Sequence, residues 1–174
     1  MIINHNELNA VRKNHKNQTI VIGLGSFDMF HWEHLQFLKD AKKLGDILVI
    51  AVKDNLAVST KGANRPIVDE SQRLEIIDSI KEVDYTILAN ERVNIAPLVS
   101  SYSISENKIE REWWEIFYPI FKNLQPDILH CEENHFVRKS RAIYLNKLNT
   151  KIITRKYRGL ITTSKIIKKV KNNA

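Results

Sequence analysis

The sequence contains one cysteine, no apolar run long enough to cross a membrane and no internal repeat. A single cysteine, Cys131, excludes an intramolecular disulfide framework and is typical of a reducing compartment. The N-terminus lacks the continuous apolar core of a signal peptide, so we expect a cytoplasmic protein with no membrane segment. Neither a zinc-finger spacing nor an aromatic–basic RNA-binding motif is present, and we therefore expect no nucleic-acid partner.

Positive charge is in excess, with a formal net charge of +7 at pH 7. This charge suits an anionic ligand such as a nucleotide or a phosphorylated sugar, although it would also suit nucleic acid. Much of it lies near the C-terminus, where a lysine-rich helix is usually just solvated. The 174 residues predict one compact domain, and the 43% hydrophobic content is enough for a core. The lysines of this predicted C-terminal helix are Lys165, Lys168, Lys169 and Lys171.

An apolar strand, an amphipathic helix and a second apolar strand follow one another over residues 19–52. Residues 19–25 (TIVIGLG) predict a buried strand, and residues 46–52 (DILVIAV) predict the next one. Between them, apolar residues recur at helical spacing. In open α/β sheets, ligands bind beyond the carboxyl ends of such strands. The helical positions are Leu35, Leu38, Ala41 and Leu44.

Two histidines, His31 and His34, lie where the first strand passes into the helix. The amides of a helix start favour an anion. Histidine can donate a hydrogen bond to a phosphate oxygen and can carry charge near neutral pH. This spacing indicates a phosphate-handling site. His130 and His135 follow a later strand end, and we expect them near the same cleft.

The segment around these histidines resembles the signature of cytidylyltransferase-like nucleotidyltransferases, which reads roughly G-T/C-F-D-x-x-H-x-G-H. Glu33 stands where that signature has its last glycine. Residues 61–66 (KGANRP), followed by Arg73 and residues 83–84 (VD), are similar to a run in bacterial heptose-phosphate adenylyltransferases. Residues 161–166 (ITTSKI) resemble the family's I-S-T-T-x-I segment. The matching signature residues are Gly25, Ser26, Phe27, Asp28, His31 and His34.

The resemblance implies an α/β fold, with a Rossmann-like doubly wound parallel sheet and helices on both faces. Residues 1–174 would form one nucleotidyltransferase domain, with an N-terminal extension at 1–18 and a family-atypical insertion at 89–124. Such an enzyme transfers a nucleoside monophosphate from a nucleoside triphosphate to a phosphorylated small molecule and releases pyrophosphate. We expect Mg²⁺ to arrive with the triphosphate, because no carboxylate cluster marks a dedicated metal site. A homodimer is compatible with these expectations.

The resemblance also assigns roles to residues. His31, His34 and Lys61 would be catalytic, because they would neutralise charge that builds on the phosphates. Hydroxyls and free amides at the start of the last helix suit a phosphate, and Thr162 or Thr163 would also cap that helix. The expected nucleotide-binding residues are Gly25, Ser26, Phe27, Asp28, Arg158, Thr162, Thr163 and Ser164. Further candidates for substrate binding are Glu33, Arg65, Asn134 and His135.

Departures from the family pattern leave alternatives open. Glu33 would add bulk and negative charge beside the nucleotide, and residues 131–135 (CEENH) replace a K-G-G-D-Y segment of the adenylyltransferases. Residues 61–66 favour ATP and a sugar 1-phosphate, whereas Trp32 resembles glycerol-3-phosphate cytidylyltransferases, which use CTP. We rank adenylyl transfer slightly over cytidylyl transfer to a polyol phosphate such as glycerol 3-phosphate. A non-catalytic nucleotide-binding module with a degenerate site is the third reading.

The rest of the chain continues the alternation, with strands expected at 85–88, 127–130 and 151–154 and a helix at 139–148. The serine-rich start of segment 89–124 predicts a loop. Its second half predicts a helix that Pro119 should kink or end early. Packing on the domain's own core is favoured over an interface or a lid, although Trp113 and Trp114 are adjacent and should not both face the core. The apolar stripe of that helix is Ile109, Trp113, Ile116, Phe117, Ile120 and Phe121.

Overall fold

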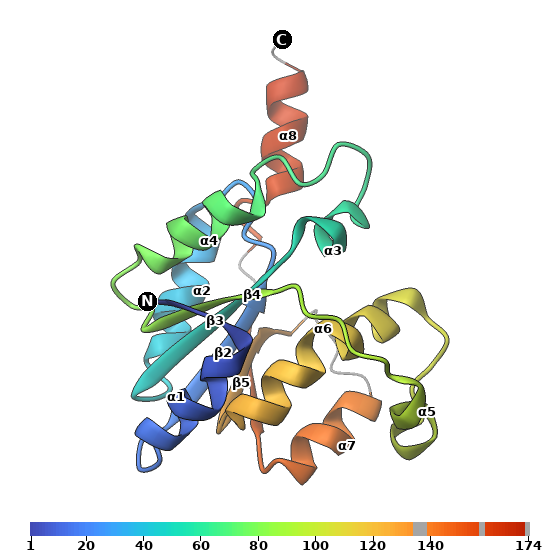
Figure 1. Ribbon diagram of the computed structural model, residues 1–174. Coiled ribbons are helices and arrows are strands. Elements are labelled where there is room, and N and C mark those ends of the chain that lie inside the picture. Colours follow the sequence, from blue (N-terminus) through green and yellow to red (C-terminus); the bar gives the residue numbers. More distant parts are fainter. Residues whose placement is uncertain (134–138, 157–158, 173–174) are drawn as a thin grey trace.

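The computed structural model describes residues 1–133, 139–156 and 159–172. Its centre is a six-stranded sheet in the order β1-β4-β3-β2-β5-β6, in which every neighbouring pair is parallel. The chain moves outward from β2 in one direction and then returns to add β5 on its other side, which makes a topological switch point there (Figure 1). The strands are β1 (Ile2–Ile3), β2 (Ile20–Gly25), β3 (Ile47–Lys53), β4 (Tyr85–Ala89), β5 (Ile128–Glu132) and β6 (Lys151–Arg155).

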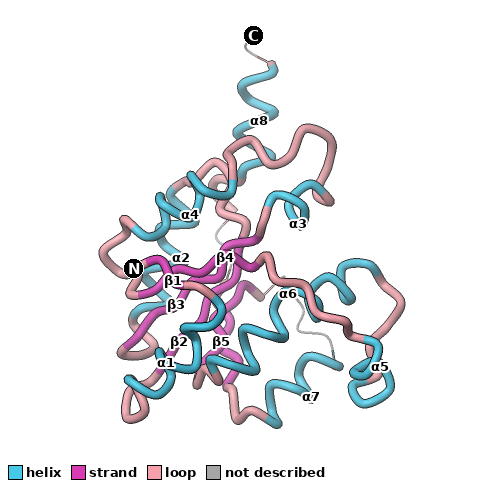
Figure 2. Tube along the Cα trace, in the orientation of Figure 1, coloured by secondary structure: helices cyan, strands magenta, loops and turns pink. Residues whose placement is uncertain are grey.

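Helices cover both faces of this sheet, as Figure 2 shows. Alternate residues of β2 point to opposite faces, because side chains alternate along a strand. Ile20 and Ile22 join one buried core with α1, α6 and α7, whereas Val21 joins the other with α2 and α4. The predicted doubly wound α/β fold is confirmed. The helices are η1 (His5–Glu7), α1 (Leu8–Asn14), α2 (Trp32–Lys42), α3 (Asn55–Ser59), α4 (Glu70–Asp78), α5 (Ala96–Tyr102), α6 (Lys108–Leu124), α7 (Lys139–Lys147) and α8 (Thr163–Lys171).

Residues 1–18 contribute to both the sheet and the core. Ile2 pairs with Thr86 and Ile3 with Ile87, so β1 extends the sheet beyond β4. Leu8 on α1 is fully buried. Arg12 forms an ion pair with Asp127 at 2.9 Å and anchors α1 beside the start of β5. A two-residue strand is too short to give a periodic signal, which is why this pairing was not foreseen.

The backbone of segment 89–124 differs from its prediction in two ways. The serine-rich part contains a helix, α5, and α6 continues through Pro119 instead of ending there. A proline inside a helix leaves the carbonyl four residues earlier without its donor. Here that carbonyl belongs to Glu115, and the amide of Val93 donates to it at 3.1 Å. A hydrogen bond from outside the helix therefore satisfies the position that the proline leaves open.

Both adjacent tryptophans of α6 are buried, contrary to expectation. Trp114 is fully buried against Tyr102 of α5 and Tyr144 of α7, while Trp113 is 8% exposed and packs on Phe117. The two rings point to different neighbours because α6 is covered by α5 and α7 on one side and by the sheet on the other. The expected packing of this segment on the domain's own core is confirmed.

Candidate active site

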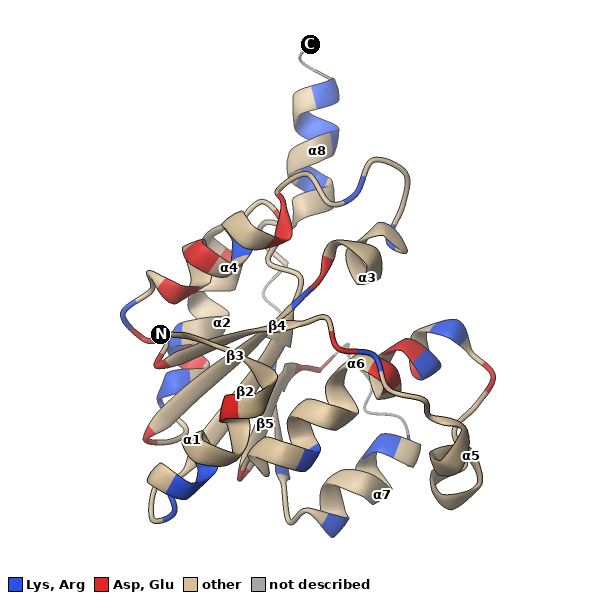
Figure 3. Ribbon diagram, viewed as in Figure 1, with Lys and Arg blue, Asp and Glu red and all other residues tan. Residues whose placement is uncertain are grey.

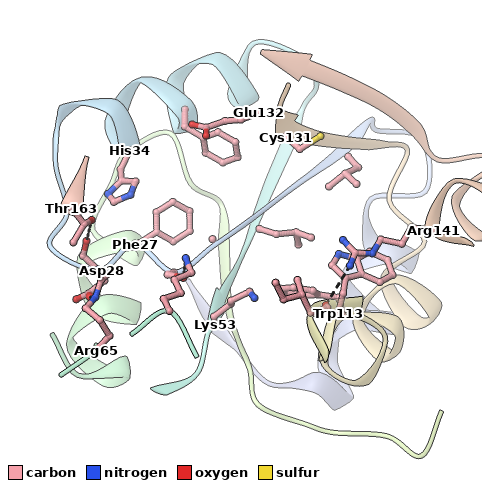
Figure 4. Close-up of a pocket in the computed structure, with 18 residues that line it drawn as sticks. Phe27, Asp28, His34, Lys53, Arg65, Trp113, Cys131, Glu132, Arg141 and Thr163 are labelled. Carbon is pink, nitrogen blue, oxygen red and sulfur yellow. Dashed lines mark hydrogen bonds and ion pairs between the residues drawn. The ribbon is translucent and has the colours of Figure 1, made fainter. Parts of the chain in front are cut away.

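A pocket of about 340 Å³ opens at the carboxyl ends of β2, β3 and β5. Figure 4 shows two sides of this pocket. The polar side consists of Ser26, Asp28, His34, Lys61, Arg65 and Thr163. The aromatic side consists of Ile109, Trp113 and Phe117 from α6, with Arg141 from α7.

The two motif histidines stack on one another beside the polar side. Their ring centroids are 3.8 Å apart and their planes differ by 17°. His31 is the N-cap residue of α2 and His34 lies in its first turn, where His34 lines the pocket. The Nδ1 atoms of both rings are buried without a hydrogen-bond partner among the described residues. Buried polar atoms of a folded protein usually have partners, so these two nitrogens are unsatisfied polar atoms directly beside the pocket.

Burial favours the neutral form of both histidines. Burial lowers the pKa of His34 to about 3, and the nearby His31 and Lys61 lower it further. Burial also lowers the pKa of His31, against the opposing charge of Glu33. A neutral imidazole still donates one N–H, so each ring can hydrogen-bond to a phosphate oxygen without carrying charge. A bound polyanion would favour the protonated form of either ring.

Lys61 reaches into the pocket from the segment after α3. Its Nζ donates to Ser26 Oγ at 2.7 Å, which brings the second motif segment onto the first. Burial lowers the pKa of Lys61 to about 8, with further contributions from the positive charges of Lys53 and Arg65. The predicted group of His34, Ser26 and Lys61 therefore meets in one place.

Asp28 joins three segments of the pocket. Its carboxylate accepts hydrogen bonds from Arg65 Nε at 2.6 Å and from the Val68 amide at 2.9 Å, and its carbonyl accepts one from Thr163 Oγ1 at 2.8 Å. Burial alone would raise the pKa of Asp28, but the amides of Val68 and Ile67 and the Arg65 guanidinium outweigh it and hold the pKa below its ordinary value. Because its oxygens are engaged in this way, Asp28 fixes the shape of the polar side.

Two further residues support the turn after β2. A Cβ added to Gly25 would lie 2.7 Å from the Phe27 ring, so this close approach requires glycine. Arg73 is fully buried and donates to the carbonyls of Ser26 at 2.5 Å and Lys53 at 2.7 Å. This arginine ties the ends of β2 and β3 together beneath the pocket.

Glu33 does not line the pocket. The sequence predicted that it would lie beside the nucleotide and crowd it, and this prediction is wrong. Its side chain is 1% exposed and its Oε2 lies 2.9 Å from Nη2 of Arg155 at the end of β6. The amide of Leu160 also approaches Oε1 at 3.4 Å. The buried arginine attracts the carboxylate toward β6, so the signature glycine is replaced by one half of an ion pair.

The remaining predicted residues divide between the pocket and other places. Thr162 caps α8 by accepting from the Lys165 amide at 3.0 Å, and Thr163 lines the pocket. Ser164 borders a neighbouring depression with Lys61 and Lys168. Figure 3 shows the basic residues along α8 in blue. Three further predicted site residues, Asn134, His135 and Arg158, lie outside the described residues.

His130 is the one described histidine whose predicted place is wrong. It is 2% exposed and packs on Phe37 with ring centroids 4.9 Å apart, in the core rather than in the pocket lining. Its neighbours on either side, Leu129 and Cys131, line the pocket instead. Side chains alternate along a strand, so adjacent positions at the end of β5 face different ways.

The sequence did not predict that Lys53 and residues of α6 line the pocket. Lys53 follows a strand end, as His31 does, and the rule that ligands bind beyond carboxyl ends could have found it. No local pattern predicts that α6 lines the pocket, because its place depends on distant packing. Within the described ranges, no group of three or more His, Cys, Asp or Glu could hold a metal ion. None of the described helices is long and apolar enough to cross a membrane.

Comparisons with known proteins agree with this geometry. Residues 22–169 match the family model described as cytidylyltransferase-like. A protein named FAD synthase from Archaeoglobus profundus is 32% identical over 156 residues, which covers 86% of this chain and 84% of that protein. The bifunctional protein HldE of Helicobacter pylori is 42% identical over 78 residues, which covers 44% of this chain and only 17% of that protein.

Solved structures give the same answer for the fold. The lipopolysaccharide core biosynthesis protein from Thermoplasma volcanium aligns with a TM-score of 0.55 and 27% identity, over 80% of this chain and 98% of that chain. A pantoate-beta-alanine ligase from Francisella tularensis aligns with a TM-score of 0.57 at 18% identity, over 98% of this chain and 77% of that one, and shares the fold alone. The chain therefore belongs to the cytidylyltransferase-like family and is a nucleotidyltransferase.

Proposed function

We propose that this protein transfers an adenylyl group from ATP to a phosphate oxygen of a small phosphorylated acceptor and releases pyrophosphate. The observation that carries the proposal is the stacked His31–His34 pair, which lies beside Lys61 at the carboxyl ends of the central strands. ATP is favoured over CTP because the relative aligned over most of both chains is named FAD synthase. The resemblance of residues 61–66 to heptose-phosphate adenylyltransferases points the same way.

The reaction needs no nucleophile from the protein. A phosphate oxygen of the acceptor forms a bond to the α-phosphorus, and the bond from that phosphorus to the bridging oxygen breaks, so that pyrophosphate leaves with the electron pair. Catalysis then consists of aligning two anions and stabilising charge in the transition state. His34 would donate to an α-phosphate oxygen, and Lys61 would neutralise the growing charge.

The leaving pyrophosphate would lie toward the start of α8. The backbone amides of Thr163 and Ser164, which have no carbonyl partner within the helix, suit phosphate oxygens at this place, and the Thr163 hydroxyl holds this turn against the Asp28 carbonyl. We propose that Mg²⁺ enters bound to the triphosphate and supplies positive charge there. The described residues fit this role and not that of a dedicated cage, because Asp28 is already engaged by Arg65 and Val68.

A screen for pyrophosphate release tests the proposal. Purified protein with Mg²⁺ is given ATP or CTP, each paired with FMN, glycerol 3-phosphate or a heptose 1-phosphate. FMN is included because FAD is its adenylylated form. Turnover with ATP and at least one acceptor is expected, and His34→Ala serves as the background control. Turnover with CTP alone would replace adenylyl by cytidylyl transfer, whereas nucleotide binding without turnover by any pair would favour the non-catalytic module.

A further inference from the structure

Lys53 lies between the two sides of the pocket, at the carboxyl end of β3 (Figure 4). Its carbonyl accepts a hydrogen bond from buried Arg73 at 2.7 Å, so the backbone of this residue is fixed. Its side chain is 20% exposed and extends toward α6. There its ammonium lies 2.7 Å from Glu112 Oε1 and 5.8 Å from the ring centroid of Phe117.

Arg141, the other cation on this side of the pocket, is held much more firmly. Its Nη2 pairs at 2.8 Å with Glu110, whose side chain is 1% exposed. That carboxylate also accepts from Trp114 Nε1 at 3.1 Å and from the hydroxyl of Ser140. Arg141 therefore belongs to a buried network that joins α6 to α7, and releasing it would leave a buried charge uncompensated.

The ion pair of Lys53 can be exchanged more easily. It consists of one ammonium and one carboxylate oxygen, and both side chains are partly exposed (20% and 12%). A lysine ammonium is a point charge on a flexible stem, so it can leave a carboxylate for a phosphate with little rearrangement. A phosphate dianion also attracts the ammonium more strongly than a single carboxylate does.

Lys53 is close enough to the polar side to act on the same reaction. Its positive charge helps to lower the pKa of Lys61, so the two ammonium groups influence one another across the pocket. Lys61 contacts Ser26, and Arg65 is engaged by Asp28. Transfer between two phosphates requires a cation for each of them, because the anions must be held side by side. Lys53 meets this need for the second phosphate.

The surface next to Lys53 shows what the rest of the acceptor is like. Ile109, Trp113 and Phe117 line the pocket there, and Ile109 is 64% exposed, whereas Trp113 is 8% and Phe117 1% exposed. A polyhydroxylated group placed against these side chains would lose hydrogen bonds to water without replacing them. An apolar or aromatic group would bury favourable surface at the same place.

We propose, on the basis of the nucleotidyl transfer argued above, that Lys53 binds the phosphate of the acceptor by exchanging Glu112 for it, and that α6 receives an apolar, ring-bearing remainder. The acceptor is then a phosphate monoester of a ring-containing alcohol. Glu112 holds the ammonium in place in the free protein, and Ile109 and the edge of Trp113 select what the phosphate is attached to.

Phenyl phosphate is a minimal probe that combines a ring with a phosphate. Calorimetric titrations of the intact protein, with and without α,β-methylene-ATP and Mg²⁺, compare this probe with glycerol 3-phosphate. Wild type should bind phenyl phosphate at least tenfold more tightly than glycerol 3-phosphate. Lys53→Met should lower the affinity for phenyl phosphate at least tenfold, while the affinity for the ATP analogue stays within twofold of wild type. Lys53→Arg should restore most of the lost affinity for phenyl phosphate. Lys43→Met, on the exposed side of α2, is the matched control.

Glu112→Gln tests the exchange itself. Removal of the competing carboxylate charge should raise the affinity for phenyl phosphate severalfold. An unchanged or weaker affinity would reject the exchange. The assignment of Lys53 is wrong if Lys53→Met leaves the probe unaffected, or if it weakens the ATP analogue as much as the probe. Failure of the analogue to bind even wild type would instead reject the proposed function, so the two failures are distinguishable.

Discussion

Glu33 and Arg155 form a buried ion pair that connects the first turn of α2 to the end of β6, with Oε2 and Nη2 2.9 Å apart. Nη1 of the same arginine lies 3.3 Å from the Glu33 carbonyl, so the guanidinium holds both the side chain and the backbone of this residue. The position carries glycine in the family signature. In this chain the carboxylate faces the sheet and compensates an arginine that is itself 6% exposed.

Restoring the signature glycine should therefore destabilise the protein. Glu33→Gly removes the nearer carboxylate from buried Arg155 and leaves only Asp40, whose Oδ2 lies 3.9 Å from Nε. Losing one half of a buried ion pair costs about 3–5 kcal/mol of the free energy of unfolding, and we expect a loss toward the lower end of this range. Glycine inside the first helical turn adds about 0.5–1 kcal/mol. Denaturant unfolding followed by circular dichroism measures the sum.

The double variant Glu33→Gly, Arg155→Met provides the control. An apolar side chain in place of the arginine should recover more than half of the lost stability, because no buried charge then depends on the distant Asp40 carboxylate alone. If the single variant unfolds at the same denaturant concentration as wild type, the ion pair contributes nothing and the carboxylate is free for another role.

His34→Ala should lower kcat about 10²-fold or more, with a smaller change in nucleotide affinity. Loss of one preorganised donor to a developing charge is felt mainly in the transition state. Steady-state kinetics with the nucleotide and acceptor identified by the pyrophosphate screen measures this. His15→Ala, which removes an imidazole that contacts Tyr85 outside the pocket, is the matched control. An unchanged kcat would remove His34 from the catalytic group.

One part of the polar side could be predicted because its residues are near one another in the sequence, whereas Lys61, Arg65 and Thr163 were found only through their resemblance to family motifs. Gly25, Ser26 and Asp28 precede the two histidines within one strand-to-helix turn, and local chemistry decides that turn. The partner of Glu33 could not be found in this way, because Arg155 lies 122 positions further along the chain. No local pattern predicts a pairing between a helix residue and a strand so distant in the sequence.

Segment 89–124 shows the same limit in its backbone. Proline has no amide donor, so Pro119 predicts a break in the helix. The amide of Val93 supplies the missing hydrogen bond to the Glu115 carbonyl, and the helix can therefore continue. The apolar stripe of α6 correctly predicted a buried helix. Its two tryptophans were misjudged because a helix covered on two sides buries more than one stripe.

Asp28→Asn should loosen the polar side of the pocket. The amide keeps the shape of the carboxylate but not its charge, so the ion pair with Arg65 and the short bonds to Ile67 and Val68 weaken. We expect a loss of about 3 kcal/mol in the free energy of unfolding and a nucleotide KM raised at least tenfold. Asp46→Asn is the control, because that carboxylate accepts from the Thr19 amide at the opposite end of the sheet. Equal effects of the two substitutions on KM would show that Asp28 has no special connection to the pocket.

Nucleotide affinity should fall as the pH rises through about 8, the pKa to which burial lowers Lys61. A triphosphate stabilises the charged ammonium, so the pKa of Lys61 is higher in the complex than in the free protein. Between these two pKa values, binding takes up a proton, and each rise of one pH unit weakens the affinity by up to about tenfold. Below pH 8 the ammonium is already charged, so its contribution to the affinity no longer depends on pH. Titrations with α,β-methylene-ATP from pH 7 to 10 measure this, and Lys61→Arg should abolish the break because guanidinium stays charged throughout. A break that persists in Lys61→Arg would assign the titration to another group.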